Sequence, residues 1–226
     1  MATFKLIIFC LLFLCISEIQ AQKHPVFYGG IEFYRNSTFS NSRYSSLNIG
    51  SQIYQVKFFA PEIGFTHYWG AIDEIENYIN PQPSHIPHGK FLQGFNASFL
   101  SLNPKLKFGK EDAFLTINPV YHTGTMTGKA GYLEYSGING RYESVAKSQR
   151  ISEKYSFWSF AVGFEGLALT NRYWFALSLH YTTINARGVW KQLDFSEYDI
   201  NPDTGYINTI GFGIRFYYNP FGSKND

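Results

Sequence analysis

The stretch IGFGIRFYY, residues 210–218, places a large apolar side chain at every second position. Gly211, Gly213, Arg215 and Tyr217 occupy the positions between Ile210, Phe212, Ile214, Phe216 and Tyr218. Successive side chains of a β-strand point to opposite faces. The pattern therefore predicts a strand with one apolar face and one face that carries an arginine. The solvent that each face meets decides the fold.

The whole chain is rich in aromatic residues yet polar on average. Phe, Tyr and Trp make up 19% of its 226 residues, with 22 Phe and 17 Tyr, and the mean hydropathy is −0.18. A transmembrane β-barrel has this composition, because an apolar outer band with aromatic girdles surrounds a polar interior. The formal net charge of +2 indicates neither a nucleic-acid footprint nor an acidic tail.

The first 21 residues have the order of a secretory signal peptide. Lys5 precedes an apolar run over 6–16, and the small residue Ala21 comes directly before Gln22. The run is shorter than the about 20 apolar residues that a membrane-spanning helix needs. We therefore expect residues 1–21 to be removed on export. A lipoprotein signal at Cys15 is the weaker alternative, because the bulky Leu14 precedes the cysteine.

Both cysteines of the chain, Cys10 and Cys15, lie within this predicted signal peptide. The mature chain, residues 22–226, would then have no disulfide framework, no thiolate metal site and no cysteine nucleophile. Its length suits a single domain.

Period-two patterning recurs over segments of about ten residues, as it does in barrel strands. A phase slip between Phe99 and Leu100 predicts a bulge, and Pro119 predicts a local irregularity. The polar stretch NSTFSNSRYSS, residues 36–46, is predicted to be a loop. The pattern predicts eight strands, at 26–35, 52–59, 63–70, 91–108, 113–123, 156–167, 173–186 and 210–218.

The predicted connections alternate between long and short, beginning with a long one. Outer-membrane barrels have an even number of strands, short periplasmic turns and long extracellular loops. The sequence therefore predicts an all-β fold: a transmembrane antiparallel up-and-down β-barrel of about eight strands with both ends in the periplasm. Large extracellular loops are predicted at 125–154 and 187–206. A soluble β-sandwich is the alternative, and it would not sort its loops in this way.

A signal peptide that ends in AQ, about eight amphipathic strands and aromatic-rich segments such as APEIGFTHYW, residues 60–69, resemble the small OmpX-like outer-membrane barrel proteins of the Bacteroidota. The resemblance spans the mature chain and implies an eight-stranded barrel in the cell outer membrane, in a group that mostly lacks a defined activity. One departure is that NPFGSKND continues past Tyr218. We expect residues 219–226 to form a short periplasmic tail.

The polar face of the strands predicts the content of the lumen. An eight-stranded barrel is only wide enough for side chains to fill it, and charges held there need partners. We expect Arg215 to contact Glu32 on the adjoining strand, and a loop carboxylate to complete an acid–base network. A proton or ion path is the functional alternative to this structural interpretation. The residues predicted to face the lumen are Glu32, Lys57, Lys105, Lys107, Asn118, His122, Glu165, His180 and Arg215.

Some short motifs bear on chemistry without predicting a site. Residues 199–205 (DINPDTG) place oxygen ligands at alternate positions, but Ile210 stands where a calcium loop has its glutamate, so a turn is the better interpretation. His85 and His88 are predicted to lie in a solvated loop. The sequons at Asn36 and Asn96 are attributed to chance in a bacterial protein. No metal site and no cofactor is predicted.

His180-Tyr181-Thr182 is loosely similar to the His-x-Ser pair of outer-membrane lipid A deacylases, with Thr in place of Ser. Its predicted phase puts His180 inside the barrel, away from lipid, and a hydroxyl nucleophile also needs a base and an orienting group. No catalytic residue is assigned, and a lipid A-modifying hydrolase is kept as the alternative function.

The sequence therefore predicts a non-enzymatic outer-membrane barrel that presents loops for interaction or acts as an accessory subunit of an outer-membrane complex. A narrow channel is the third hypothesis. The expected partners are outer-membrane lipid and lipopolysaccharide, and a protein partner at the loops, with no nucleic acid. The loop residues suited to contacts are Tyr132, Tyr135, Tyr142, Trp190 and Tyr198.

Overall fold

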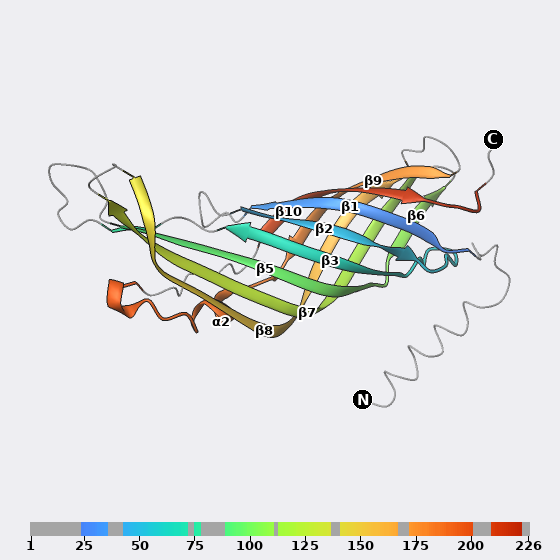
Figure 1. Ribbon diagram of the computed structural model, residues 1–226. Coiled ribbons are helices and arrows are strands. Elements are labelled where there is room, and N and C mark those ends of the chain that lie inside the picture. Colours follow the sequence, from blue (N-terminus) through green and yellow to red (C-terminus); the bar gives the residue numbers. More distant parts are fainter. Residues whose placement is uncertain are drawn as a thin grey trace, which may run out of the picture.

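The computed structural model describes residues 24–35, 43–71, 75–77, 89–110, 113–136, 141–166, 172–200 and 209–222. Almost all of the described chain is β-strand (Figure 1). A short helix α2 (Arg187–Trp190) and a 3₁₀ turn η1 (Ser196–Tyr198) follow β9. The strands are β1 (Val26–Arg35), β2 (Arg43–Gln52), β3 (Glu62–Ala71), β4 (Ile75–Asn77), β5 (Gly89–Asn103), β6 (Leu106–Lys110), β7 (Ala113–Ser136), β8 (Arg141–Glu165), β9 (Tyr173–Thr182) and β10 (Thr209–Tyr218).

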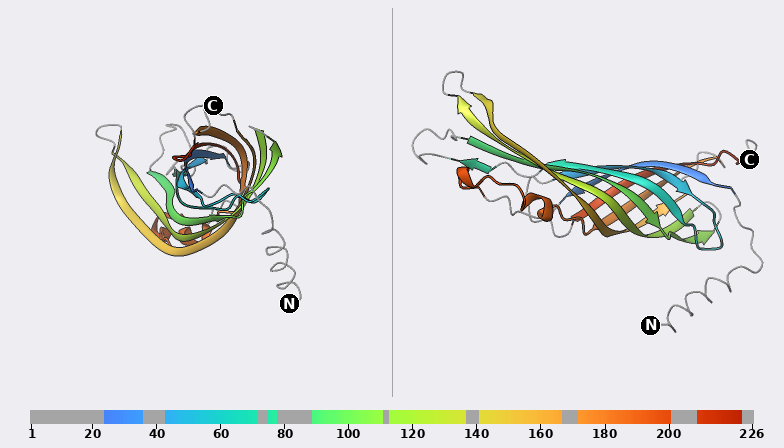
Figure 2. Two further views of the ribbon diagram at one scale, coloured as in Figure 1. Left: turned by 90° about the vertical axis from the view of Figure 1, so that its right-hand side faces the viewer. Right: turned by 60° about the horizontal axis from the view of Figure 1, so that its bottom comes forward.

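Eight of these strands form a closed antiparallel ring. The pairings run β1–β2–β3–β5–β7–β8–β9–β10, and β10 pairs with β1 again. Strands that follow one another in the chain are thus neighbours in the sheet, which is an up-and-down barrel (Figure 2, left). The short strands β4 and β6 add to β5 and β7 respectively. The predicted fold class is confirmed.

Alternation along each strand separates an apolar outer face from the lumen. In β10, Phe212 and Ile214 are exposed while Gly211 and Gly213 are buried, as the sequence predicts. The same phase holds around the ring, so the barrel carries a continuous belt of exposed apolar side chains. Members of this belt are Phe27, Phe33, Leu47, Ile49, Ile63, Phe65, Leu100, Leu102, Leu115, Ile117, Phe160, Val162, Leu177, Leu179, Ile210, Phe212 and Ile214.

The first and last strands begin and end at one end of the barrel, since Phe27 is the register partner of Tyr218. We call this the near end and the opposite one the far end. At the far end β5, β7 and β8 continue well past the closed ring as a curved three-stranded sheet, the wall (Figure 2, right). In the described part of the chain, no helix is long and apolar enough to span a membrane.

The second strand differs from the prediction. It is Arg43–Gln52, whereas residues 52–59 contain a tight turn in which Val56 pairs with Phe59 and Lys57 has a positive φ of 52°. The predicted loop at 36–46 therefore overlaps β2. In β2, Ser46 and Asn48 face the lumen and are small polar residues of the kind that loops contain, while Leu47 and Ile49 face outward.

The strand around Phe99 has no bulge, so that prediction is wrong. Phe95, Phe99 and Asn103 are all buried, and the register with β3 and β7 continues without a shift. The sequence pattern suggests a phase slip only because aromatic rings face the lumen here. The interruption lies instead between β5 and β6. Pro119 lies opposite this break, where its missing N–H donor disturbs the sheet least.

The region 125–154 is not a loop. Most of it forms the far halves of β7 and β8, which pair with each other as far as Ser136 and Arg141. Conversely, β9 ends at Thr182 rather than at 186. Residues 183–200 leave the barrel and lie against the inner side of the wall, with α2 below β7 and β8 in Figure 1. We call residues 183–200 the strap.

Candidate functional site

Six charged side chains fill the near half of the lumen. Arg215 on β10 contacts Glu32 on β1 (Nη2–Oε1, 3.1 Å) and Glu62 on β3 (Nη1–Oε2, 3.2 Å). Lys105 lies between Glu62, at 2.8 Å, and Glu165 on β8. Lys107 contacts the same Glu165 at 2.6 Å. Three acids thus alternate with three bases, and the charges balance across five strands and the β5–β6 break.

Neutral groups donate further hydrogen bonds to these carboxylates. Glu32 accepts hydrogen bonds from Tyr34, Ser46 and Asn48 at 2.6–2.9 Å. Glu62 accepts from Asn103 and Tyr217, and Glu165 accepts from the indole N–H of Trp174. Buried ion pairs are tolerated when such additional hydrogen bonds are made. The network is therefore a polar core in which every charge has an oppositely charged partner, although Arg215 Nε makes no hydrogen bond.

The predicted contact of Arg215 with Glu32 is confirmed, and Lys105, Lys107 and Glu165 are buried in the lumen as expected. Asn118, His122 and His180 are buried there too. Lys57 is not, because the turn at 56–59 leaves it exposed. Glu62 also faces the lumen, which the sequence pattern did not predict. Its position directly after Ala60-Pro61 made it look like a turn residue, although it supplies the additional carboxylate that the excess of bases required.

Two histidines lie in the lumen next to the charged network, on its far-end side. His122 contacts Ser101 through Nδ1 at 2.9 Å and Ser159 through Nε2 at 2.8 Å. His180 contacts Ser178 at 2.6 Å and lies 3.7 Å from Glu32. Gly213 leaves room for it, since a Cβ there would lie 2.5 Å from His180 Nε2. His122 is therefore held by hydroxyl groups of the two neighbouring strands, β5 and β8, and His180 by a hydroxyl group of its own strand, β9.

The lumen becomes apolar toward the far end. The ring of Phe157 stacks on His122 with centroids 4.5 Å apart. Beyond it, wall and strap residues form one buried cluster: Phe91, Phe95, Phe99, Met126, Ala130, Tyr132, Ile184, Ala186, Val189, Trp190, Leu193, Phe195 and Ile200. In the described part of the chain, charged side chains thus fill the near half of the lumen, and the apolar cluster fills its far end.

Helix α2 packs closely on the wall. A Cβ at Gly128 of β7 would lie 2.9 Å from Val189 and 3.1 Å from Trp190, so the glycine allows this approach. The Trp190 side chain is fully buried and donates its indole N–H to the Gly94 carbonyl oxygen at 3.3 Å. The buried Trp190 side chain therefore anchors the strap to the wall.

Polar contacts fasten the outer half of the strap. The Asp194 N–H donates to Gln149 Oε1 at 2.7 Å, and Lys147 forms an ion pair with Glu197 at 2.7 Å. The hydrogen bond to Glu197 raises the pKa of Lys147 above its ordinary value. Hydrogen bonds donated by the hydroxyl and the backbone N–H of Ser196 lower the pKa of Asp194. These contacts lie on β8 beyond the apolar belt.

The predicted contact residues have a different role from the expected one. Trp190 and Tyr132 are buried, and Tyr198 stacks on Tyr132 with centroids 4.0 Å apart. These three hold the strap to the wall and are not a free surface for a partner. The side chains of Tyr135 and Tyr142 lie outside the described residues.

The short motifs considered as catalytic or metal sites form no such site within the described residues. His180 and Thr182 are both buried in the lumen, so the loosely matched deacylase motif does not face outward. Asp199 is described, with a φ of 55°, but residues 201–208 of the candidate calcium loop are not. His85, His88 and Asn36 also lie outside the described residues. No cluster of three described metal-ligating side chains occurs.

No family model and no curated protein matches the chain. Solved structures that it resembles include Ail, the attachment invasion locus protein of Yersinia pestis, in complex with the heparin analogue sucrose octasulfate (12% identity, 89% of this chain, 100% of that one, TM-score 0.39). Neisserial surface protein A matches at 11% identity over 88% and 97% of the two chains, with a TM-score of 0.41. The N-terminal β-barrel domain of Pseudomonas aeruginosa OprF matches at 12% over 88% and 100%, with a TM-score of 0.35. These structures are small outer-membrane β-barrels.

Proposed function

We propose that the protein is a non-enzymatic β-barrel of the cell outer membrane, with its near end in the periplasm and its wall outside the cell. The observation that carries this proposal is the exposed apolar belt around a closed ring of strands. Exposed apolar patches on soluble proteins rarely exceed a few hundred Å². A ring of Phe, Ile, Leu and Val on every strand is stable when it faces lipid.

Aromatic pairs at the two edges of the belt support this orientation. Near the termini, Tyr173 stacks on Tyr218 with centroids 5.1 Å apart. Toward the wall, Tyr121 lies against Trp158 at 5.2 Å. Aromatic residues concentrate at membrane interfaces, because their rings are apolar and their polar groups reach water. The belt between these girdles is the segment that we place in the hydrocarbon layer.

The predicted processing of the chain belongs to this proposal. Residues 1–21 would be removed as the signal peptide, 22–226 would form the barrel domain, and 219–226 would form a periplasmic tail. An origin among the Bacteroidota rests on the AQ-ended signal peptide and on the aromatic-rich strands. Lipid and lipopolysaccharide would surround the belt.

The role that the geometry supports best is presentation of the wall outside the cell, either for binding or within a larger outer-membrane complex. The wall is stiffened by the apolar cluster and the strap, so it holds a fixed shape beyond the membrane. A pre-organised surface loses little conformational entropy on binding. The balanced, side-chain-filled lumen favours this role over a channel.

Membrane fractionation followed by a heat-modifiability gel tests the proposal. We expect the protein in the outer-membrane fraction, with faster migration when it is not boiled, because a closed barrel resists unfolding by detergent. A soluble location together with unchanged migration would overturn the architecture in the membrane and the function with it.

One contact bears on the alternative of a lipid-modifying hydrolase. His67 Nδ1 lies 2.8 Å from Ser98 Oγ, and both side chains are on the outer face beside Trp69. A serine nucleophile needs a base and an orienting group. The described carboxylates all lie in the lumen or at the strap, so none of them accompanies this pair. Lipid A mass spectra from a deletion strain separate the two hypotheses: altered acylation would favour the hydrolase.

A further inference from the structure

A small closed cavity lies in the lumen where the charged network meets the two histidines. Its volume of about 10 Å³ is close to the space that one water molecule requires. Glu32, Asn103 and Arg215 of the network line the cavity, together with His122 and the buried Val120 of β7. The cavity therefore admits only a ligand of about the size of a water molecule, and most of the groups around it are polar.

Two buried polar atoms of the residues that line this cavity make no hydrogen bond. The terminal nitrogens of Arg215 contact Glu32 and Glu62, whereas its Nε has no partner. The amide nitrogen of Asn103 donates to Glu62 and Asn118, whereas its Oδ1 accepts nothing. A buried donor or acceptor without a partner is unfavourable, and internal water molecules commonly supply the missing contact.

The two side chains that carry these atoms are neighbours. Arg215 Nη1 and Asn103 Nδ2 donate to the same oxygen, Glu62 Oε2, at 3.2 Å and 2.9 Å. This shared oxygen holds the guanidinium and amide groups next to each other at the side of one cavity. A molecule in the cavity can therefore contact both groups.

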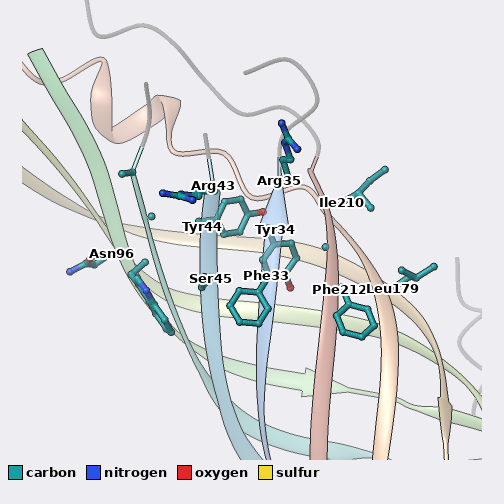
Figure 3. Close-up of a pocket in the computed structure, with 14 residues that line it drawn as sticks. Phe33, Tyr34, Arg35, Arg43, Tyr44, Ser45, Asn96, Leu179, Ile210 and Phe212 are labelled. Atoms are coloured by element: carbon teal, nitrogen blue, oxygen red, sulfur yellow. The ribbon is translucent and has the colours of Figure 1, made fainter. Parts of the chain in front are cut away.

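Tyr34 separates this cavity from a larger one. The larger cavity, of about 730 Å³, lies at the far ends of β1, β2, β3 and β10, where Tyr34 and Tyr44 are among the residues that line it (Figure 3). The Tyr34 ring stacks on that of Tyr44 with centroids 4.6 Å apart, and its hydroxyl donates to Glu32 at 2.6 Å. Both tyrosines are buried. The small cavity is thus closed toward the far end, and lumen side chains determine what it binds.

The charges around the cavity favour a neutral ligand. Glu32 and Arg215 carry opposite charges and already contact each other at 3.1 Å. An additional ion would be attracted by one of these groups and repelled by the other. A water molecule both accepts and donates hydrogen bonds, and the site offers one donor and one acceptor.

We infer that the lumen holds one internal water molecule, which accepts a hydrogen bond from Arg215 Nε and donates one to Asn103 Oδ1. This water completes the hydrogen bonding of the charged network at the point where the network meets the histidines. The inference goes beyond the proposed function, because it concerns the interior of the closed ring and depends on neither the membrane nor the wall.

A crystal structure of the wild-type barrel, at a resolution that shows ordered water, tests the site directly. We expect one water oxygen at about 2.7–3.2 Å from both Arg215 Nε and Asn103 Oδ1. An ion at this position would overturn the inference. So would a direct contact between the two atoms, or electron density that shows nothing bound there.

Val120→Ile tests the site in solution, because the added methylene group competes with the water for the cavity. Displacement of the water leaves both polar atoms without a partner, so the ratio of folded to unfolded protein should fall about tenfold in a urea titration. The matched control Val162→Ile adds the same group to the exposed outer face and should unfold as the wild type does. If Val120→Ile were as stable as this control, the cavity would be a dry void and the inference would be wrong.

Two further measurements separate displacement of the water from a general folding defect. Both variants are first checked for the heat-modifiable band, whose loss would report on the barrel and not on the water. The crystal structure of Val120→Ile should then show the isoleucine side chain in place of the water.

Discussion

Arg215 joins two parts of the lumen network, because its two terminal nitrogens contact carboxylates on different strands. Removal of one partner from a buried ion pair leaves an uncompensated charge, which costs about 3–5 kcal/mol. We expect Arg215→Met to lower the free energy of unfolding by about this amount, measured by urea titration of the refolded barrel in detergent.

A second substitution separates the lost charge from lost packing. Glu32→Gln/Arg215→Met also removes one of the two carboxylates that lose their contact with the arginine. It should therefore recover part of the lost stability. Glu62 keeps its contact with Lys105, so it needs the arginine less. If the double variant were as unstable as Arg215→Met, the defect would lie in packing around the side chain.

Trp190 holds the strap to the wall, as Arg215 holds the lumen network together. Its side chain is fully buried between the helix and the wall, and truncation of a buried tryptophan to alanine costs about 3–5 kcal/mol. We expect Trp190→Ala to release residues 183–200, measured as faster hydrogen exchange and proteolysis of that segment while the heat-modifiable band persists. Trp158→Ala is the matched control, because this tryptophan is exposed on the outer face. Equal release by both variants would contradict the anchoring role.

Strand β2 illustrates how an element can be misread. Its sequence RYSSLNIGSQ alternates small polar residues that face the lumen with Leu47 and Ile49 that face outward. If this outer face meets lipid, an arginine there costs about 2–4 kcal/mol near the middle of the bilayer and about 0–1 near its edge. We expect Ile49→Arg to impair folding into vesicles strongly, measured as the yield of heat-modifiable protein.

Thr125→Arg provides the comparison for this element. Thr125 is exposed on β7, beyond the girdle formed by Tyr121 and Trp158, so the introduced charge would lie in water. Its folding yield should match that of the wild type. A strong defect in both variants, or in neither, would contradict the assigned belt.

The fastening of the strap should be insensitive to pH over the neutral range. The lowered pKa of Asp194 gives a contribution that is complete above its ordinary value of 3.8 and is lost as the pH falls below that. The raised pKa of Lys147 gives a contribution that is complete below 10.5 and is lost as the pH rises further. Proteolysis of the strap should therefore be constant between about pH 5 and 9. A marked change within that window would show that other groups control the strap.

Side chains fill the lumen of the barrel in both its near half and its far end. Charged side chains fill the near half of the lumen, and the apolar cluster fills its far end. Eight strands leave an interior that side chains can fill. We expect no steady conductance in planar bilayers, either for the wild type or for Trp190→Ala, since release of the strap leaves the charged network in place. Steady single-channel currents from the wild type would contradict the filled lumen.

Period-two alternation by itself determined that this chain forms amphipathic antiparallel strands, because each residue's face follows from its position along a strand. It also placed Arg215 beside Glu32, since consecutive strands of an up-and-down barrel are neighbours and the first meets the last. The apolar outer face of IGFGIRFYY and the burial of Lys105, Lys107 and Glu165 followed from the same rule.

Only the tertiary structure decided the rest. β2 is too polar to be recognised until the lumen that receives Ser46 and Asn48 exists. The inward-facing ring of Phe95 is buried against Trp190 of the strap, about 95 residues later in the chain. Glu62 joins the network through Lys105 and Arg215, which are distant in sequence. Such contacts depend on closure of the ring, which brings distant residues together without leaving a local pattern in the sequence.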